Sequence, residues 1–276
     1  MLNPSGVVAG AYQLKLIHLF DFLFLGAENT MHLTTDDILG SLSTIMASFT
    51  FKDVHAFRQM LQSTNTILSG SAALAIFEPK CFTPTDLDFY VHLSNMGSLM
   101  LFLSRHEYYV ETTCDYGHLF ANNNDNDVTM VLTLRNFSAE KNINIIVAMD
   151  GRRLLSIITH FDSTIAMNYV AWYGFVSMYS TWTSANQGLI TNKRESERWI
   201  DMYRTRGFSL FNRATSLPAI EMGHICGQSY SCPKTQRYLF DRDTLFIPFS
   251  YDRPPFIFNY EEYFTSSLAC RCDIQP

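Results

Sequence analysis

A glycine-serine pair followed by two alternating aspartates constrains the fold of this sequence more than any other feature. The apolar run Thr66–Leu68 predicts a short strand that ends at Gly70 and Ser71, where a helix begins. After a turn, an alternating run places Asp86 and Asp88 on the same face of a second strand. We therefore expect a strand, a sharp bend into a helix, and a return strand that presents a pair of carboxylates.

These residue types suit phosphate and metal chemistry. Backbone N–H groups at the start of a helix attract anions, and Gly70 lets a ligand approach closely because it has no side chain. The carboxylates of Asp86 and Asp88 would repel each other unless a cation lay between them. Mg²⁺ prefers such oxygen ligands and commonly shares them with the phosphates of a substrate. The combination is typical of phosphoryl or nucleotidyl transfer.

The arrangement resembles the nucleotidyltransferase superfamily, whose fold is shared by polymerase beta and the aminoglycoside nucleotidyltransferases. The matching residues are Ile67–Ser71 and Asp86–Val91. The resemblance implies that Asp86 and Asp88 hold Mg²⁺ and carry catalysis, while Gly70 and Ser71 bind the phosphates of a nucleoside triphosphate. A nucleotidyl group would then pass to a hydroxyl acceptor, which the sequence does not identify.

The chain is also similar to uncharacterised nucleotidyltransferase-like proteins of mushroom-forming fungi. The similarity includes the strand Ile143–Val147, the stretch Phe161–Thr164, and the pair Met167 and Asn168. Asp162 stands where those proteins have a histidine, so a role of that histidine does not carry over. This closer similarity implies no function of its own.

The sequence departs from the superfamily at the third carboxylate, which active members carry on a later strand. The corresponding position here is Asn144, and an amide supplies neither negative charge nor a useful proton acceptor. Asp127 and Asp150 flank the strands concerned and are possible substitutes. Three alternatives stay open. The protein is an active enzyme, or a degenerate member that binds a nucleotide or a protein without turnover, or an interaction scaffold that uses the aromatic-rich C-terminal half.

The predicted fold class is α/β (α+β), with a mixed sheet flanked by helices. We expect a helical N-terminal segment over 1–50, a nucleotidyltransferase-like core over 51–165, and a helical and irregular region over 166–276. Further strands are predicted at Tyr108–Thr113, Val128–Leu134 and Ile143–Val147. Helices are predicted from Thr34–Asp37 onward and at Lys52–Leu61, Met96–Arg105, Arg152–Ile158, Phe161–Met178 and Lys193–Arg206.

Basic residues gather on or beside the last predicted helix, and they could meet a triphosphate or an acidic acceptor. They are Lys193, Arg194, Arg198, Arg204 and Arg206. Because acidic residues interleave with them, an ordinary salt-bridged surface explains the same pattern. Tyr90 and His92, which share the face of the aspartates, are expected either to line the nucleotide pocket or to face solvent.

Cysteine spacing gives little support to a metal or thiol site. A zinc site could draw on the group His224, Cys226, Cys232, Cys270 and Cys272, but the group lacks a tight C-x₂-C or C-x₄-C pair, so packed or free thiols are the simpler interpretation. Cys114 and His118 show no activating partner for a nucleophile. Six cysteines in 276 residues favour reduced thiols in a cytoplasmic protein rather than a disulfide-stapled secreted one.

Charge and hydropathy narrow the classes of partner. The net charge of -6 argues against a positive field over the whole surface that would attract nucleic acid. A small substrate, or a local basic patch, is still compatible with this charge. The apolar segment Leu14–Ala27 is interrupted by His18 and Asp21 and is too short to span a bilayer. We expect a buried helix there, or an imprecise gene start, rather than a signal peptide or a membrane anchor.

Overall fold

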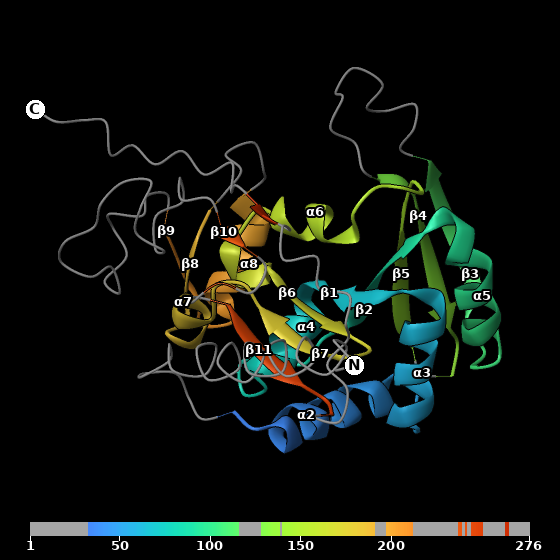
Figure 1. Cartoon of the computed structure of the whole chain (residues 1–276), viewed down its shortest axis with the longest axis horizontal. Helices are drawn as coiled ribbons and strands as arrows, with labels where there is room; N and C mark the ends of the chain where they lie inside the picture. The colour runs from blue at the N-terminus through green and yellow to red at the C-terminus, as the bar shows by residue number, and fades with distance from the viewer. Residues whose placement is uncertain are drawn as a thin grey trace, which may run out of the picture.

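An eight-stranded mixed sheet forms the centre of the molecule in the computed structural model of the chain (Figure 1). The structure describes residues 33–115, 128–138, 140–190, 197–211, 237–238, 241, 244–250 and 263–264. The strand order is β11-β7-β6-β1-β2-β5-β4-β3, and β2 and β5 are its parallel pair. The predicted fold class, a mixed sheet flanked by helices, is confirmed.

Two helices precede the first strand, and further helices follow β1, β2 and β5 along the chain. The first half contains α2 (Thr35–Ser48), α3 (Val54–Thr64), β1 (Ile67–Ser69), α4 (Gly70–Phe77), β2 (Asp86–His92), α5 (Leu93–Ser104), β3 (Tyr109–Asp115), β4 (Val128–Asn136) and β5 (Lys141–Ala148). The second half contains α6 (Leu154–Thr159), the 3₁₀ turn η1 (Thr164–Ala166), β6 (Asn168–Ala171), β7 (Gly174–Ser177), α7 (Ser180–Ser184), β8 (Gln187–Leu189), α8 (Glu197–Thr205), β9 (Ser209–Phe211), β10 (Arg237–Tyr238), β11 (Leu245–Pro248) and β12 (Tyr263–Phe264).

The alternation predicted for β2 divides its side chains between the two faces of the sheet. Leu87, Phe89 and Val91 enter the larger hydrophobic core, which they share with α2, α3, α4 and α5. On the opposite face, Tyr90 packs in a second core with residues of β6, α6 and α7. Strand alternation therefore leaves Asp86, Asp88 and Tyr90 together on the face away from α2 and α3.

Local signals explain where the N-terminal helices start. Thr34 caps α2, and its hydroxyl accepts from the backbone N–H of Asp37, whose carboxylate accepts in return from the backbone of Thr34. Asp53 caps α3 by accepting from the backbone N–H of Ala56. Both helices then bury apolar stripes, which include Leu42 in α2 and helped to predict their positions.

The prediction of a helix over Phe161–Met178 is wrong. This segment contains η1 and then the hairpin of β6 and β7, in which Ala171 pairs with Gly174 across a two-residue turn. Its strand residues are buried, and β6 and β7 are internal strands of the large sheet. Because such strands are buried on both faces, they carry an apolar run without the alternation that identifies a half-exposed strand.

A small two-stranded sheet connects α8 to the rest of the molecule. Strand β9, directly after α8, pairs in parallel with β8. Strand β8 is joined to η1, because the backbone N–H of Leu189 donates to the Thr164 hydroxyl at 2.9 Å. A third hydrophobic cluster packs Tyr203, Phe208 and Leu210 against residues that include Leu74 of α4. These contacts hold α8 beside the start of α4.

The expected boundary near residue 165 does not divide the sheet, because β6, β7 and β11 lie beyond it and continue the same sheet. Within the part of the chain that the structure describes, no helix is long and apolar enough to cross a membrane. The segment Leu14–Ala27, and with it the prediction made for it, lies outside the described residues.

Candidate active site

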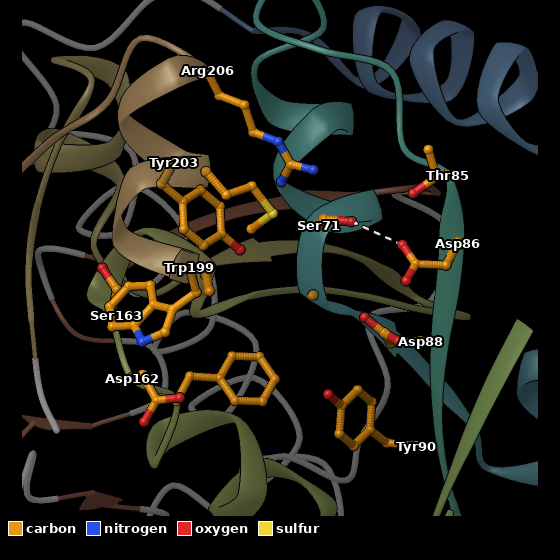
Figure 2. A pocket seen from close by; sticks show the side chains of 14 residues that line it. Ser71, Thr85, Asp86, Asp88, Tyr90, Asp162, Ser163, Trp199, Tyr203 and Arg206 are labelled. Atoms are coloured by element: carbon orange, nitrogen blue, oxygen red, sulfur yellow. Dashed lines mark hydrogen bonds between the residues drawn. The ribbon is translucent and has the colours of Figure 1, made fainter. Parts of the chain in front are cut away.

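A pocket with a volume of about 350 Å³ opens between β2, the start of α4 and α8 (Figure 2). It contains all four residues that the sequence predicted for the site: Gly70, Ser71, Asp86 and Asp88. Its remaining lining residues are Thr85, Tyr90, Phe161, Asp162, Ser163, Ala166, Trp199, Met202, Tyr203 and Arg206. The volume lies within the range of small-molecule sites, which is roughly 300–1,000 Å³.

Strand pairing brings the bend at Gly70 against the aspartates. Strands β1 and β2 are antiparallel neighbours, and Ser69 pairs with Asp88. Gly70 has a φ of 69°, and a Cβ atom added to it would lie 2.2 Å from Oδ2 of Asp88. Only glycine satisfies both the left-handed backbone and this close approach.

Asp86 contacts the first turn of α4. The Ser71 hydroxyl donates to Oδ1 of Asp86 over 3.5 Å, a weak hydrogen bond (Figure 2). The hydroxyl and both carboxylates therefore lie together beside the N-terminal end of α4, where backbone N–H groups are free of partners within the helix.

Asp88 is held at the centre of the sheet by a chain of hydrogen bonds. It pairs with Asn144 across β2 and β5, and the Asn144 amide donates to Oδ1 of Asp88 at 2.9 Å. The Thr133 hydroxyl on β4 donates in turn to Oδ1 of Asn144 at 3.1 Å. These contacts fix the orientation of the amide, and they place Asn144 where the resemblance to nucleotidyltransferases implied a third acid.

Burial raises the pKa of Asp88 to about 6, with a smaller rise from the negative charge of Asp86. The hydrogen bond from Asn144 acts in the opposite direction and lowers the pKa of this carboxyl. At neutral pH the Asp88 carboxylate is therefore mostly ionised, although it lies in surroundings that disfavour its charge. A cation beside it would relieve this cost.

The wall opposite the carboxylates comes from α8 and the residue that follows it. Tyr203 and Arg206 project from this wall toward α4 and β2, and the Trp199 ring lies beside Asp162 and Ser163 (Figure 2). Burial raises the pKa of Tyr203 to about 12; the guanidinium of Arg206 opposes the rise, and the charges of Asp88, Asp86 and Asp162 add to it. The Tyr203 phenol is therefore influenced by the positive charge of Arg206 and by the negative charges of the aspartates, and it stays protonated at neutral pH.

The other predicted neighbours of the aspartates separate into pocket and surface. Tyr90 lines the pocket, whereas the His92 ring makes a hydrogen bond of 2.8 Å with the backbone carbonyl of Arg152.

The exposed Asp150 accepts from the backbone N–H and the hydroxyl of Ser94 at the start of α5. It follows the end of β5 at Ala148 and lies beside the start of α5, so it does not take the position of the third acid next to Asp88. Asp127 lies outside the described residues.

The proposed zinc group, the thiol pair and part of the basic group fall outside the pocket or outside the described residues. The group of His224, Cys226, Cys232, Cys270 and Cys272 lies outside the described residues, as do His118, Lys193 and Arg194 and the side chain of Arg198. Cys114, on β3, is an exposed free thiol. No role in the pocket was predicted for Trp199 or Tyr203; their apolar spacing on a charged helix was the available signal.

The carboxylates of Asp86 and Asp88 fit a Mg²⁺ ion whose other ligands are water molecules and substrate oxygens. Within the described ranges, no group of three or more His, Cys, Asp and Glu side chains could enclose a metal ion. Mg²⁺ is usually bound by one or two carboxylates together with phosphates and water, rather than by an all-protein cage. Two adjacent carboxylates in a pocket, one of them with a raised pKa, match that requirement.

Comparison of the sequence with models of known protein families finds no match, and the sequence matches no curated protein either. The function is therefore inferred from the geometry of the pocket.

Proposed function

We propose that this protein binds a nucleoside triphosphate with Mg²⁺ in the pocket and transfers a nucleotidyl group to a hydroxyl acceptor. One observation carries the proposal: Asp86 and Asp88 face a pocket of about 350 Å³ directly beside the bend at Gly70 and Ser71. The pair provides the hard oxygen ligands that Mg²⁺ prefers, and the bend provides a helix start for phosphate.

Asp86 and Asp88 would hold the Mg²⁺, which when bound would neutralise phosphate charge and polarise the phosphoryl centre. The Ser71 hydroxyl and the backbone at the start of α4 would orient the phosphates. Asn144 would keep the Asp88 carboxylate in place through the hydrogen bond of 2.9 Å. Arrangement of this kind lowers the barrier by positioning, without a covalent intermediate on the protein.

Asn144 favours a second candidate function, which is nucleotide binding without turnover. The amide occupies the strand position opposite Asp88, where its N–H donates a hydrogen bond, and it cannot take a proton from an attacking hydroxyl. General-base catalysis contributes about 10²–10⁴-fold to a rate, so its loss leaves binding intact while slowing transfer strongly.

Calorimetric titration with ATP, CTP, GTP and UTP, each with and without Mg²⁺, tests the binding step that both functions share. We expect binding that requires Mg²⁺ and is lost in Asp86→Asn. Asp36→Asn is the matched control, because Asp36 is an exposed carboxylate on α2, on the other side of the sheet. Binding that is equally strong without Mg²⁺, or unaffected by Asp86→Asn, would contradict the proposal.

Transfer is tested with nucleotide labelled at the α-phosphate and a cell extract as a mixture of acceptors. Label that appears in new products with wild type and not with Asp86→Asn supports transfer. Mg²⁺-dependent binding without any labelled product or released pyrophosphate supports the second function.

A further inference from the structure

The structure separates two arginines that the sequence placed in one basic group. Arg204 is exposed and makes an ion pair of 3.3 Å with Asp201, one turn earlier on α8. Arg206 turns inward and lines the pocket. The ordinary salt-bridged surface therefore accounts for Arg204, and Arg206 needs another explanation.

The end of α8 determines the direction of Arg206. The helix ends at Thr205, and Gly207 has a φ of 91°, so the chain reverses immediately after Arg206. The backbone N–H of Phe208 returns to the carbonyl of Tyr203 at 3.1 Å, which closes the turn. A cation here also interacts favourably with the C-terminal end of the helix dipole.

Aromatic rings hold the guanidinium without neutralising it. Its central carbon lies 4.0 Å from the ring centre of Phe82, in the connection between α4 and β2, and 5.4 Å from that of Tyr203. Nη1 of Arg206 is buried and has no hydrogen-bond partner among the described residues. The indole N–H of Trp199, on the same wall, is also buried and has none in that part of the chain. A buried donor that lacks an acceptor costs free energy, about 1–3 kcal/mol for a neutral group and more for a charged one.

The pocket therefore has two chemically different sides. Two carboxylates lie on β2, and a guanidinium and an indole N–H lie on the wall formed by α8; the carboxylate of Asp162 lies beside that indole. No ion pair within 4.0 Å joins Arg206 to an acidic side chain in the described structure, so the two sides are not simply neutralising each other. A ligand that satisfies both sides carries an anion for Arg206 and shares a cation with the aspartates.

We propose that Arg206 binds the phosphate chain of the nucleotide from the wall opposite Asp86 and Asp88, so that the pocket selects polyphosphates over monophosphates. This inference rests on the proposed function and adds to it the residue that recognises the phosphate chain. A planar guanidinium can donate two parallel hydrogen bonds to phosphate oxygens, which the compact ammonium of lysine cannot. Trp199 would donate a further hydrogen bond or pack against the same ligand.

The test measures the affinity of Mg²⁺ complexes of AMP, ADP and ATP for wild type, Arg206→Gln, Arg206→Lys and Arg204→Gln. We expect Arg206→Gln to weaken ATP binding by about ten- to a hundred-fold, with a smaller loss for ADP and the smallest for AMP. Arg206→Lys should recover part of the ATP affinity, and Arg204→Gln should behave as wild type. Trp199 fluorescence gives a second signal, with Trp199→Phe to assign it.

A merely structural role for Arg206 makes a different prediction. If the stacking on Phe82 only held α8 in place, Arg206→Gln would lower the melting temperature and weaken AMP and ATP equally. That result, or an unchanged ATP affinity, overturns the inference. If Arg206→Gln does not fold, the comparison is made with Arg206→Lys, for which the preference for ATP over AMP must still fall.

Inorganic tripolyphosphate separates this inference from the proposed function. If ATP binding requires Mg²⁺ and Asp86 but does not depend on Arg206, the function stands and the inference fails. If wild type binds tripolyphosphate in an Arg206-dependent way but shows no Mg²⁺-dependent nucleotide binding, the anion site stands and the nucleotide function fails. If neither ligand binds, both are overturned.

Discussion

Asp88 combines a functional position with a cost to stability. Its carboxyl has a pKa of about 6 instead of 3.8, mainly because burial disfavours its charge. The folded protein therefore binds this proton more tightly than the unfolded chain does. Between pH about 4 and about 6, stability falls as pH rises, and above pH 6 the full cost of the buried charge remains.

Asp88→Asn should stabilise the protein at pH 8 while it abolishes Mg²⁺-dependent nucleotide binding. The amide carries no charge and can still accept the hydrogen bond from Asn144. A pKa difference of about 2 corresponds to at most about 3 kcal/mol, or several degrees in melting temperature. Thermal denaturation of both proteins from pH 4 to pH 8 measures the effect, and the gain should shrink toward pH 4. A variant that is less stable than wild type at pH 8 would show that the charge is already compensated.

At the scale of single residues, the sequence was sufficient for the β2 side of the pocket and insufficient for the α8 side. Alternation along one strand determines that Asp86 and Asp88 share a face, and the parallel register with β5 places Asn144 beside them. Gly207 indicates locally that α8 ends near Arg206, but the charged, amphipathic segment does not show which of Arg204 and Arg206 turns inward. Arg204 faces solvent and Arg206 faces the pocket because of how the end of α8 packs on Phe82 and Tyr203, and this packing is tertiary information.

The bend between β1 and α4 is the element that joins sheet geometry to the site. Ser69 ends the strand and donates a hydrogen bond from its buried hydroxyl to the backbone carbonyl of Asn168 on β6. Gly70 then adopts a left-handed conformation against the Asp88 carboxylate. The bend thus sets the distance between the helix start and the metal-binding carboxylates.

Gly70→Ala tests this element. The added methyl group would meet Oδ2 of Asp88 at 2.2 Å, and the positive φ would add a strain of about 1–3 kcal/mol. We expect a loss of about 2–4 kcal/mol in the free energy of unfolding and a clear loss of Mg²⁺-dependent nucleotide affinity. Chemical denaturation and calorimetry measure the two effects.

Gly97→Ala is the matched control for that experiment. Gly97 is exposed in α5, and an added Cβ atom would meet nothing within 4 Å. The change should raise stability by about 0.5–1 kcal/mol, since alanine is the better helix former, and leave nucleotide binding unchanged. Equal effects of the two substitutions would mean that the bend at Gly70 is not specially constrained.

Elements with an amphipathic pattern were predictable, whereas the hairpin of β6 and β7 was not. Helices α2 and α3 carry caps and apolar stripes, and β2 alternates, so local sequence alone indicates each type. Both strands of the hairpin are buried, and its turn at Trp172 and Tyr173 contains none of the usual turn residues. Gly174 is explained only by β11, whose Ile247 carbonyl would lie 2.6 Å from an added Cβ atom.

Across the whole molecule, the sheet continues through the point where the sequence suggested a division. The fold class was predictable because alternating strands and amphipathic helices succeed one another up to β5. The change in composition near residue 165 reflects strands buried on both faces, not the end of the sheet. Strands β6, β7 and β11 extend the sheet beyond β1, so β1 and β2 lie in its interior.

A chain cut after residue 165 should therefore fail to fold, even though it keeps all four predicted site residues. It would lose Tyr169 and Phe175 from the cores, including the stacking of Phe175 on Phe77 at 5.7 Å, and it would expose the edge of β1 that pairs with Val170. An apolar edge of this kind promotes aggregation.

A chain cut after residue 250 is the control: it keeps all eight strands of the large sheet, and it should unfold in one cooperative transition. Circular dichroism during heating, together with size-exclusion chromatography, measures both chains. If the shorter chain unfolds cooperatively as a soluble monomer, residues 33–165 are an independent domain and the strands beyond them are an addition to it.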